Sequence, residues 1–174
     1  LRCTRNFTLI YDHSVGCISG AYGIHHVDIA QWAMDADLTG PVEVEGRGSI
    51  PEEGLYDTIH TWEAWHTYAN GVKLRYIDHI SARKQIPRFN VPNSMGILFE
   101  GNTGWVYVAR GYIDAEPKSL LKTIIGPDEI QLPRSNDHRR NFLDAVRTGS
   151  PVMCPIETAL RSDSVCYQAD IAIS

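Results

Sequence analysis

The sequence has no hydrophobic run that approaches the roughly 18–20 residues of a membrane span. It has no excess of positive charge either, because the formal net charge is −5, which argues against a general affinity for nucleic acid. The first residues lack the apolar stretch that follows the basic start of a signal peptide. We therefore expect neither membrane insertion nor nucleic-acid binding.

The cysteines lack the C-x-x-C spacing of a zinc site. They are Cys3, Cys17, Cys154 and Cys166. Reduced, partly buried thiols are the simplest interpretation, and they favour the cytoplasm. An export signal upstream of Leu1 would be compatible with the same residues, so the compartment stays open.

Motifs that bind nucleotides are also missing. Gly46-x-Gly48 lacks the third glycine of a dinucleotide fingerprint and runs into Ser49-Ile50-Pro51 instead of a helix. There is no P-loop and no G-x-S-x-G elbow. We expect no Rossmann domain in this chain and no binding of NAD or NADP to these residues alone.

The overall composition, with 43% hydrophobic and 21% charged residues, is typical of a globular protein. The chain starts near a strand-like segment, Phe7–Tyr11, and ends inside a helical pattern that has no stop signal. We expect residues 1–174 to form a single domain that is a piece of a longer protein.

Three helices are predicted from apolar spacing and capping residues. The first runs from about Tyr22 to Met34, the second begins within 135–137 and stops at Gly149, and the third begins at Pro155. The apolar stripes expected on the last two are Phe142, Ala145 and Val146, then Ala159, Cys166, Ala169 and Ile173.

The middle of the chain is predicted to form strands. Segments 58–68 and 72–80 flank Asn70-Gly71, which is the strongest signal for a two-residue hairpin loop. The pairs expected from such a loop are Ala69 with Val72, Thr67 with Leu74 and Trp65 with Tyr76 on an apolar face, and His66 with Arg75 and Tyr68 with Lys73 on a polar face.

A further strand is expected at Val42–Glu45, and a second hairpin is expected over 97–108 with its turn at 101–104. The intervening segment Ser81–Asn93 is basic and interrupted by prolines, which predicts an exposed loop or arm. The order of elements predicts an α+β fold with an open, predominantly antiparallel sheet and helices packed on one face.

The run Gly23–Trp32 contains the best candidate for chemistry. His25 falls in the first helical turn, where free backbone N–H groups and the helix dipole disfavour a positive charge. Asp28, one turn later, can orient the ring and favours the charged form. A histidine poised in this way suits general-base work on a hydroxyl, although a purely structural role explains the same residues.

Other side chains near this pair have alternative roles. His26 projects about 100° around the helix from His25 and fits packing or the surface. Trp32 and Trp65 fit core aromatics better than a stacking platform for a sugar. A metal site on His25, His26 and Asp28 would need another ligand, from His60, His66 or His79. Without H-x-x-x-H or H-E-x-x-H spacing, we expect no metal.

The segment Ser14–Trp32 resembles the signature of the glucose–fructose oxidoreductase / inositol dehydrogenase / MocA (Gfo/Idh/MocA) family, whose usual form is D-x-G-x-H-x-x-D after a glycine-rich approach. Further matches follow in the family's order: Gly40-Pro41-Val42-Glu43-Val44, Tyr68-Ala69-Asn70-Gly71-Val72, Phe99-Glu100-Gly101-x-x-Gly104-Trp105 and Asn141-Phe142-Leu143-Asp144-Ala145-Val146. The resemblance covers nearly the whole chain.

This resemblance implies the C-terminal α+β domain of a two-domain NAD(P)-dependent dehydrogenase. His25 matches the family's catalytic histidine and Asp28 the acid that follows it, while Tyr22, His26 and Trp32 become candidate substrate contacts. The longer parent would use NAD or NADP to oxidise a sugar or polyol hydroxyl, with His25 accepting the proton. It would form a homo-oligomer through its open sheet face.

Two departures from the family pattern keep other functions open. The family's frequent aspartate four residues before the histidine is Ala21 here, and the lysine of its E-K-P motif belongs to the other domain. One alternative is a non-catalytic carbohydrate-binding or assembly module that uses the polar sheet face and Ser81–Asn93. Another is glycoside cleavage through transient oxidation by tightly held NAD.

Overall fold

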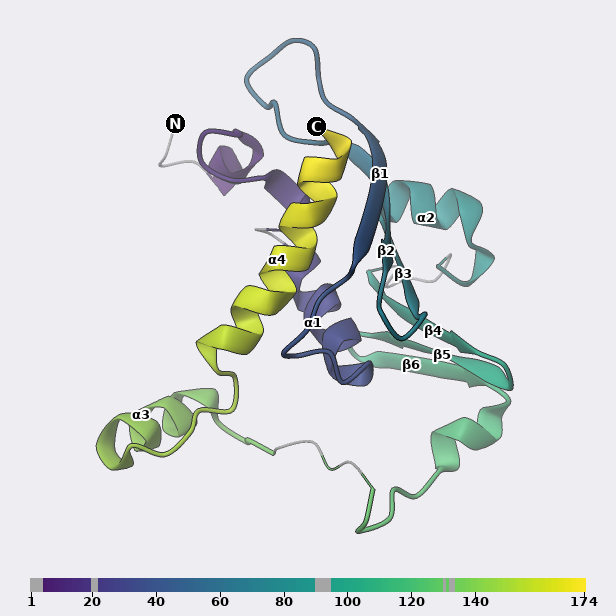
Figure 1. Ribbon diagram of the computed structural model, residues 1–174, viewed down its shortest axis with the longest axis vertical. Helices are drawn as coiled ribbons and strands as arrows, with labels where there is room; N and C mark the ends of the chain where they lie inside the picture. The colour runs from purple at the N-terminus through teal and green to yellow at the C-terminus, as the bar shows by residue number, and fades with distance from the viewer. Residues whose placement is uncertain (1–4, 20–21, 90–94, 130, 132–133) are drawn as a thin grey trace.

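The computed structural model describes residues 5–19, 22–89, 95–129, 131 and 134–174. Within them the expected α+β fold is confirmed, with four α-helices and six strands (Figure 1). The helices are Gly23–Ala33 (α1), His79–Gln85 (α2), His138–Thr148 (α3) and Ile156–Ile173 (α4). The strands are Glu43–Ser49 (β1), Thr61–Thr67 (β2), Lys73–Ile77 (β3), Gly96–Gly101 (β4), Gly104–Ala109 (β5) and Tyr112–Glu116 (β6). No helix in this part of the chain is both long and apolar enough to cross a membrane.

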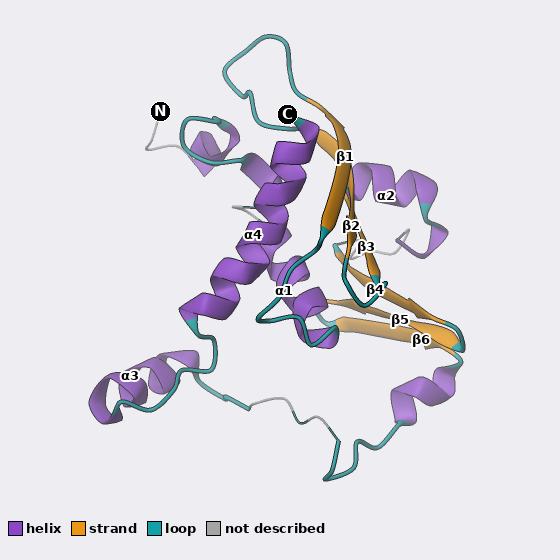
Figure 2. Ribbon diagram, viewed as in Figure 1, coloured by secondary structure: helices purple, strands orange, loops and turns teal. Residues whose placement is uncertain are grey.

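The strands form two antiparallel sheets of three, β1-β2-β3 and β4-β5-β6, where the sequence predicts one open sheet. The second predicted hairpin is confirmed as β4 and β5, and β6 extends it after a turn at Gly111, whose φ is +71°. Helices α1 and α4 pack together against the first sheet, while α2 lies on the side of that sheet away from α4 (Figure 2).

The contact between α4 and β1 depends on two glycines of the strand. A Cβ atom at Gly46 or Gly48 would lie 2.7 Å from the Ile173 side chain, which is closer than packed atoms approach. Only glycine therefore lets the last turn of α4 lie against β1. The G-x-G pair seen in the sequence is explained by this packing.

The register of the first hairpin is shifted by one residue from the predicted pairing. Tyr68 N–H donates to the Val72 carbonyl, so the loop contains three residues, with Gly71 at φ +85°. His66 consequently pairs with Leu74, and Trp65 pairs with Arg75. Because a shift of one exchanges the faces, His66 lies in the core and Arg75 outside, opposite to the prediction for His66.

Two local predictions are wrong for the same reason, namely hydrogen bonds made within a short segment. The strand-like residues Phe7–Tyr11 instead lie in and after a 3₁₀ helix, Arg5–Leu9, with Ile10 N–H donating to the Phe7 carbonyl. The predicted exposed arm contains α2, because the Asp78 carboxylate caps the backbone N–H groups of residues 80 and 81. Ala82 of α2 is buried, and residues 90–93 of the predicted arm lie outside the described residues.

Helix α3 begins at the predicted cap, where Asp137 accepts from two backbone N–H groups, and ends at Gly149 with φ +70°. Its predicted apolar face is present but is not covered, since Phe142 is 61% and Val146 68% exposed. Figure 1 shows α3 apart from both sheets. Of the three described cysteines, Cys166 is buried, Cys17 is half-buried and Cys154 is exposed, and all three are free thiols.

Candidate functional site

Helix α1, which carries His25, begins in close contact with β3. A Cβ atom at Gly23 would lie 2.0 Å from the Tyr76 hydroxyl and 2.2 Å from the Ile18 carbonyl oxygen. The same hydroxyl donates to that carbonyl over 2.5 Å. Gly23 is therefore needed for the helix to start here, a steric reason that the pattern of the sequence does not reveal.

A buried hydrogen bond fixes the inner face of α1. Gln31 is fully buried, accepts from the Tyr68 hydroxyl of the hairpin at 2.5 Å, and donates to the Ala36 carbonyl at 2.9 Å. Burial raises the pKa of Tyr68 to about 12, so the phenol stays protonated and keeps donating. The sequence pattern places Tyr68 on the polar face and gives Gln31 no role, because a polar side chain in a core shows no periodic signal.

The outer face of α1 is open. His25, Ile29 and Trp32 follow one another at i, i+4 and i+7, and all three are exposed. Tyr22, just before the helix, is exposed as well, by 43%. The His25 ring has no hydrogen-bond partner among the described residues, and its side chain is exposed to solvent.

Asp28 does not pair with His25 in the described part of the chain, in contrast to the expectation that it orients the ring. Its Oδ1 accepts from the Ser162 hydroxyl of α4 at 2.7 Å. Burial, then the charges of Asp28 and Asp35, raise the pKa of Asp37, which places the Asp28 carboxylate near that loop. The catalytic role of Asp28 remains a prediction.

A cavity of about 470 Å³ lies beside the start of α1, between the edge of β3, helix α2 and strand β4. This volume is in the range of sites for small molecules. Tyr22 and His26 line it, and the Nδ1 atom of His26 lies 3.0 Å from the Tyr22 carbonyl oxygen. The structure thus brings two of the five predicted site residues to one cavity and places His25 and Trp32 on the adjoining exposed face.

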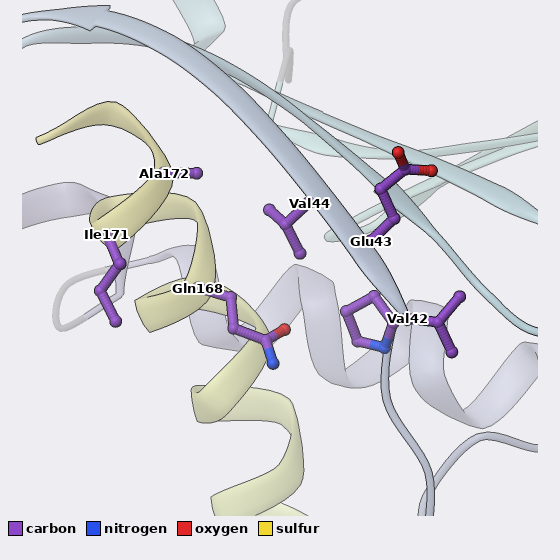
Figure 3. A pocket seen from close by; sticks show the side chains of 7 residues that line it. Val42, Glu43, Val44, Gln168, Ile171 and Ala172 are labelled. Carbon is purple, nitrogen blue, oxygen red and sulfur yellow. The ribbon is translucent and has the colours of Figure 1, made fainter.

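A second cavity, of about 340 Å³, lies between β1 and the last turns of α4 (Figure 3). Its lining is mostly aliphatic and includes Val42, Val44 and Ile171 besides the amide of Gln168, with the Val42 side chain turned away from that amide. None of the predicted site residues reaches it. It offers no group that could transfer a proton to a substrate, apart from the carboxylate of Glu43.

The described residues contain no group of three His, Cys, Asp or Glu side chains that could hold a metal ion. His66, one of the ligands considered from the sequence, is fully buried, with Nε2 3.0 Å from the Val165 carbonyl oxygen. Burial lowers the pKa of His66, which therefore stays neutral in the core.

The described residues do not fit a dinucleotide either. Every strand pair is antiparallel, so the strand–glycine turn–helix unit that cradles a pyrophosphate is not formed in these ranges. The Gly46 and Gly48 positions are covered by Ile173, as described above. Ala21, the main departure from the family signature, lies outside the described residues.

No protein-family model matches the chain, and no curated protein sequence matches it. Solved structures do. UDP-N-acetylglucosamine 3-dehydrogenase GnnA from Acidithiobacillus ferrooxidans matches in two crystal forms with TM-scores of 0.50, at 18% and 16% identity, covering 86% and 97% of this chain. A protein from Thermotoga maritima described as an oxidoreductase matches with a TM-score of 0.54, at 19% identity over 86% of this chain.

The chain spans less than half of each matched structure, namely 45%, 49% and 42% of their lengths. At these identities the likeness concerns the fold. The fold is that of part of each matched structure, and it agrees with the α+β fold that the resemblance in the sequence implies.

Proposed function

We propose that this chain is the substrate-binding and oligomerisation domain of an NAD(P)-dependent oxidoreductase that acts on a sugar or polyol hydroxyl. The observation that carries this proposal is the exposed stripe of His25, Ile29 and Trp32 beside the cavity at Tyr22 and His26. A helix whose histidine and aromatic residues face outward beside a cavity is suited to form one wall of a site.

In this site His25 accepts the proton of the substrate hydroxyl. Its ring is exposed and makes no hydrogen bond with the described residues, so it can approach a hydroxyl directly. Tyr22 and Trp32 provide aromatic surface against which a sugar ring can pack. The redox part of the reaction needs NAD or NADP, for which the residues described here form no site, so only the proton transfer is assigned to this chain.

The test uses a polypeptide that contains this chain together with a nucleotide-binding half. His25→Ala should lower turnover of the sugar or polyol by about 10²- to 10⁴-fold, the usual contribution of a general base. His138→Ala, on the exposed start of α3, is the matched control and should leave turnover unchanged. If His25→Ala turns over like the parent, the role proposed for His25 is wrong.

We also propose that the face of the first sheet opposite α4 docks a second copy. There Arg47 lies over the Trp65 ring at 5.2 Å, which presents aromatic surface next to charge. Light scattering should show a dimer or larger oligomer that Trp65→Lys dissociates, whereas Leu38→Lys in an exposed loop should not. A monomer at micromolar concentration counts against this surface.

One observation favours a second function, a non-catalytic carbohydrate-binding or assembly module. Asp28 bonds to Ser162 and leaves His25 without a carboxylate partner in the described chain. Calorimetry with sugars separates the two proposals: the module binds sugar with the same affinity after His25→Ala and shows no turnover with NAD or NADP.

A further inference from the structure

Helix α4 contacts the region around His25 through two consecutive residues. The Ser162 hydroxyl donates to Asp28 Oδ1 over 2.7 Å, and the Asp163 carboxylate accepts from the Ser19 hydroxyl. Ser162 is fully buried and Ser19 is 4% exposed. One contact lies on α1 and the other on the segment before it, so α4 holds the chain on both sides of the helix start. We call these two contacts the serine–aspartate clamp.

Apolar packing against α4 also fixes which face of α1 points inward. Val27 packs against Val165 and Cys166 of α4, and all three are buried. Positions 27, 30 and 31 therefore face inward, whereas 25, 29 and 32 face outward. Asp28 lies at the border between these faces, where its carboxylate could turn either to α4 or to His25, three residues earlier.

We propose that Ser162 is a positioning residue: its hydroxyl holds the Asp28 carboxylate against α4, so that the His25 ring stays free for the substrate. The catalytic role of the free His25 ring rests on the proposed function. The contact between Ser162 and Asp28 can be tested independently of that function. The proposal differs from the expectation drawn from the sequence, in which Asp28 orients His25 directly.

The charges around Asp28 come from several elements. Asp37 follows α1 and Cys154 precedes α4, and burial, followed by the Asp28 charge, raises the pKa of both groups. His25 and His26 are the other titratable groups on α1. Asp28 forms no ion pair in the described ranges, so no Lys or Arg of these ranges competes with Ser162 for its carboxylate.

The test is an NMR titration of the His25 ring in the chain as it stands. Ser162→Ala removes the hydroxyl, so the freed carboxylate can pair with His25 and should raise the measured His25 pKa by about 0.5 to 1 unit. Adding Asp28→Asn to that variant should remove the rise. Ser164→Ala is the matched control, since among the described residues the Ser164 hydroxyl donates to the Leu160 carbonyl of the same helix and to nothing on α1.

A second variant tests the proposal even if the Ser162→Ala chain does not fold. Asp28→Asn alone keeps an oxygen that can accept from Ser162, and it should change the His25 pKa by less than about 0.2 unit if the carboxylate is held away. A larger fall with Asp28→Asn overturns the proposal, because it shows that Asp28 already acts on His25. So does an unchanged His25 titration in a folded Ser162→Ala chain.

The outcome is separable from the proposed function. The titration needs no cofactor and no turnover, so the clamp can stand even if the parent protein oxidises nothing. In an active longer polypeptide, Ser162→Ala should move the pH at which activity rises by the same 0.5 to 1 unit, and Ser162→Thr, which restores a hydroxyl, should return it. A fall in activity with no shift in that pH would show a structural role only.

Discussion

The two faces of the first sheet hold their polar groups in different ways. On the inner face, His66 and Tyr68 are buried and make hydrogen bonds to a carbonyl of α4 and to Gln31 of α1. On the outer face, Glu63 receives hydrogen bonds from Arg47 at 3.0 Å and Arg75 at 2.6 Å. The inner groups are neutral, whereas the outer groups are ions.

Because of this difference, the stability contributed by the inner face should depend on pH, and that of the outer face on salt concentration. A buried neutral group destabilises the fold once a change of pH makes it charged, because burying an unpaired charge is costly in free energy. An ion pair near solvent responds to salt and contributes little when one partner is exposed. One strand, β2, serves both faces through alternate residues, so the two behaviours can be separated by single substitutions.

The largest loss of stability should come from a substitution that prevents α1 from packing against the inner face of the sheet at its first residue. Gly23→Ala puts a Cβ atom 2.0 Å from the Tyr76 hydroxyl, and we expect a loss of about 3 kcal/mol or more in the free energy of unfolding, measured with urea. Gly40→Ala is the control, because a Cβ atom there meets no atom within 4 Å. Equal stability of the two variants would mean that α1 does not start against Tyr76.

The next effect is a pH dependence of the inner face. Burial lowers the folded-state pKa of His66, whereas an unfolded histidine titrates near 6.5. The unfolded chain therefore binds more protons, so the His66 contribution is complete above about pH 6.5. It should be lost as pH falls toward the folded pKa, by up to about 1.4 kcal/mol per pH unit.

Urea unfolding at several pH values between 5.5 and 7.5 measures this loss. His66→Gln keeps a donor for the Val165 carbonyl but does not titrate, so its curve should be flatter than that of the parent chain. His60→Gln, at an exposed position, is the control and should keep the parent's slope. Parallel curves for both variants would exclude His66 as the source.

The smallest effect is expected on the outer face. Burial raises the pKa of Glu63, but the hydrogen bonds from Arg47 and Arg75 outweigh it and hold the pKa below its usual value. The Arg47 side chain is 72% exposed, so Arg47→Met should cost less than about 1 kcal/mol, and about 0.5 M NaCl should shrink the difference. A salt-independent loss measured by urea unfolding would contradict this view of the outer face.

The elements of the fold were largely predictable because their signals are local. Asn70-Gly71 locates the first hairpin, and Asp137 and Gly149 mark the ends of α3. The register was not predictable, because a loop of three residues uses the same Asn-Gly pair as a loop of two. That single residue moves His66 from the predicted polar face to the core.

The candidate site was predictable only in part. The run around His25 identifies the helix, and the structure confirms α1 from Gly23 to Ala33. Its contacts come from residues far along the chain, such as Tyr68 with Gln31 and Ser162 with Asp28, and neither pair has a local pattern. For the same reason the sequence assigned Asp28 to His25, its neighbour by helical spacing.

The serine–aspartate clamp also bears on the order in which the chain can assemble during synthesis. Its two contacts join residues that are 134 and 144 positions apart. At 5–20 residues per second, a ribosome needs roughly 7 to 27 s to travel from Asp28 to Ser162. The helix that contains His25 is thus synthesised long before the α4 residues that contact it. In a chain that ends before α4, the inner face of this helix would lack those contacts.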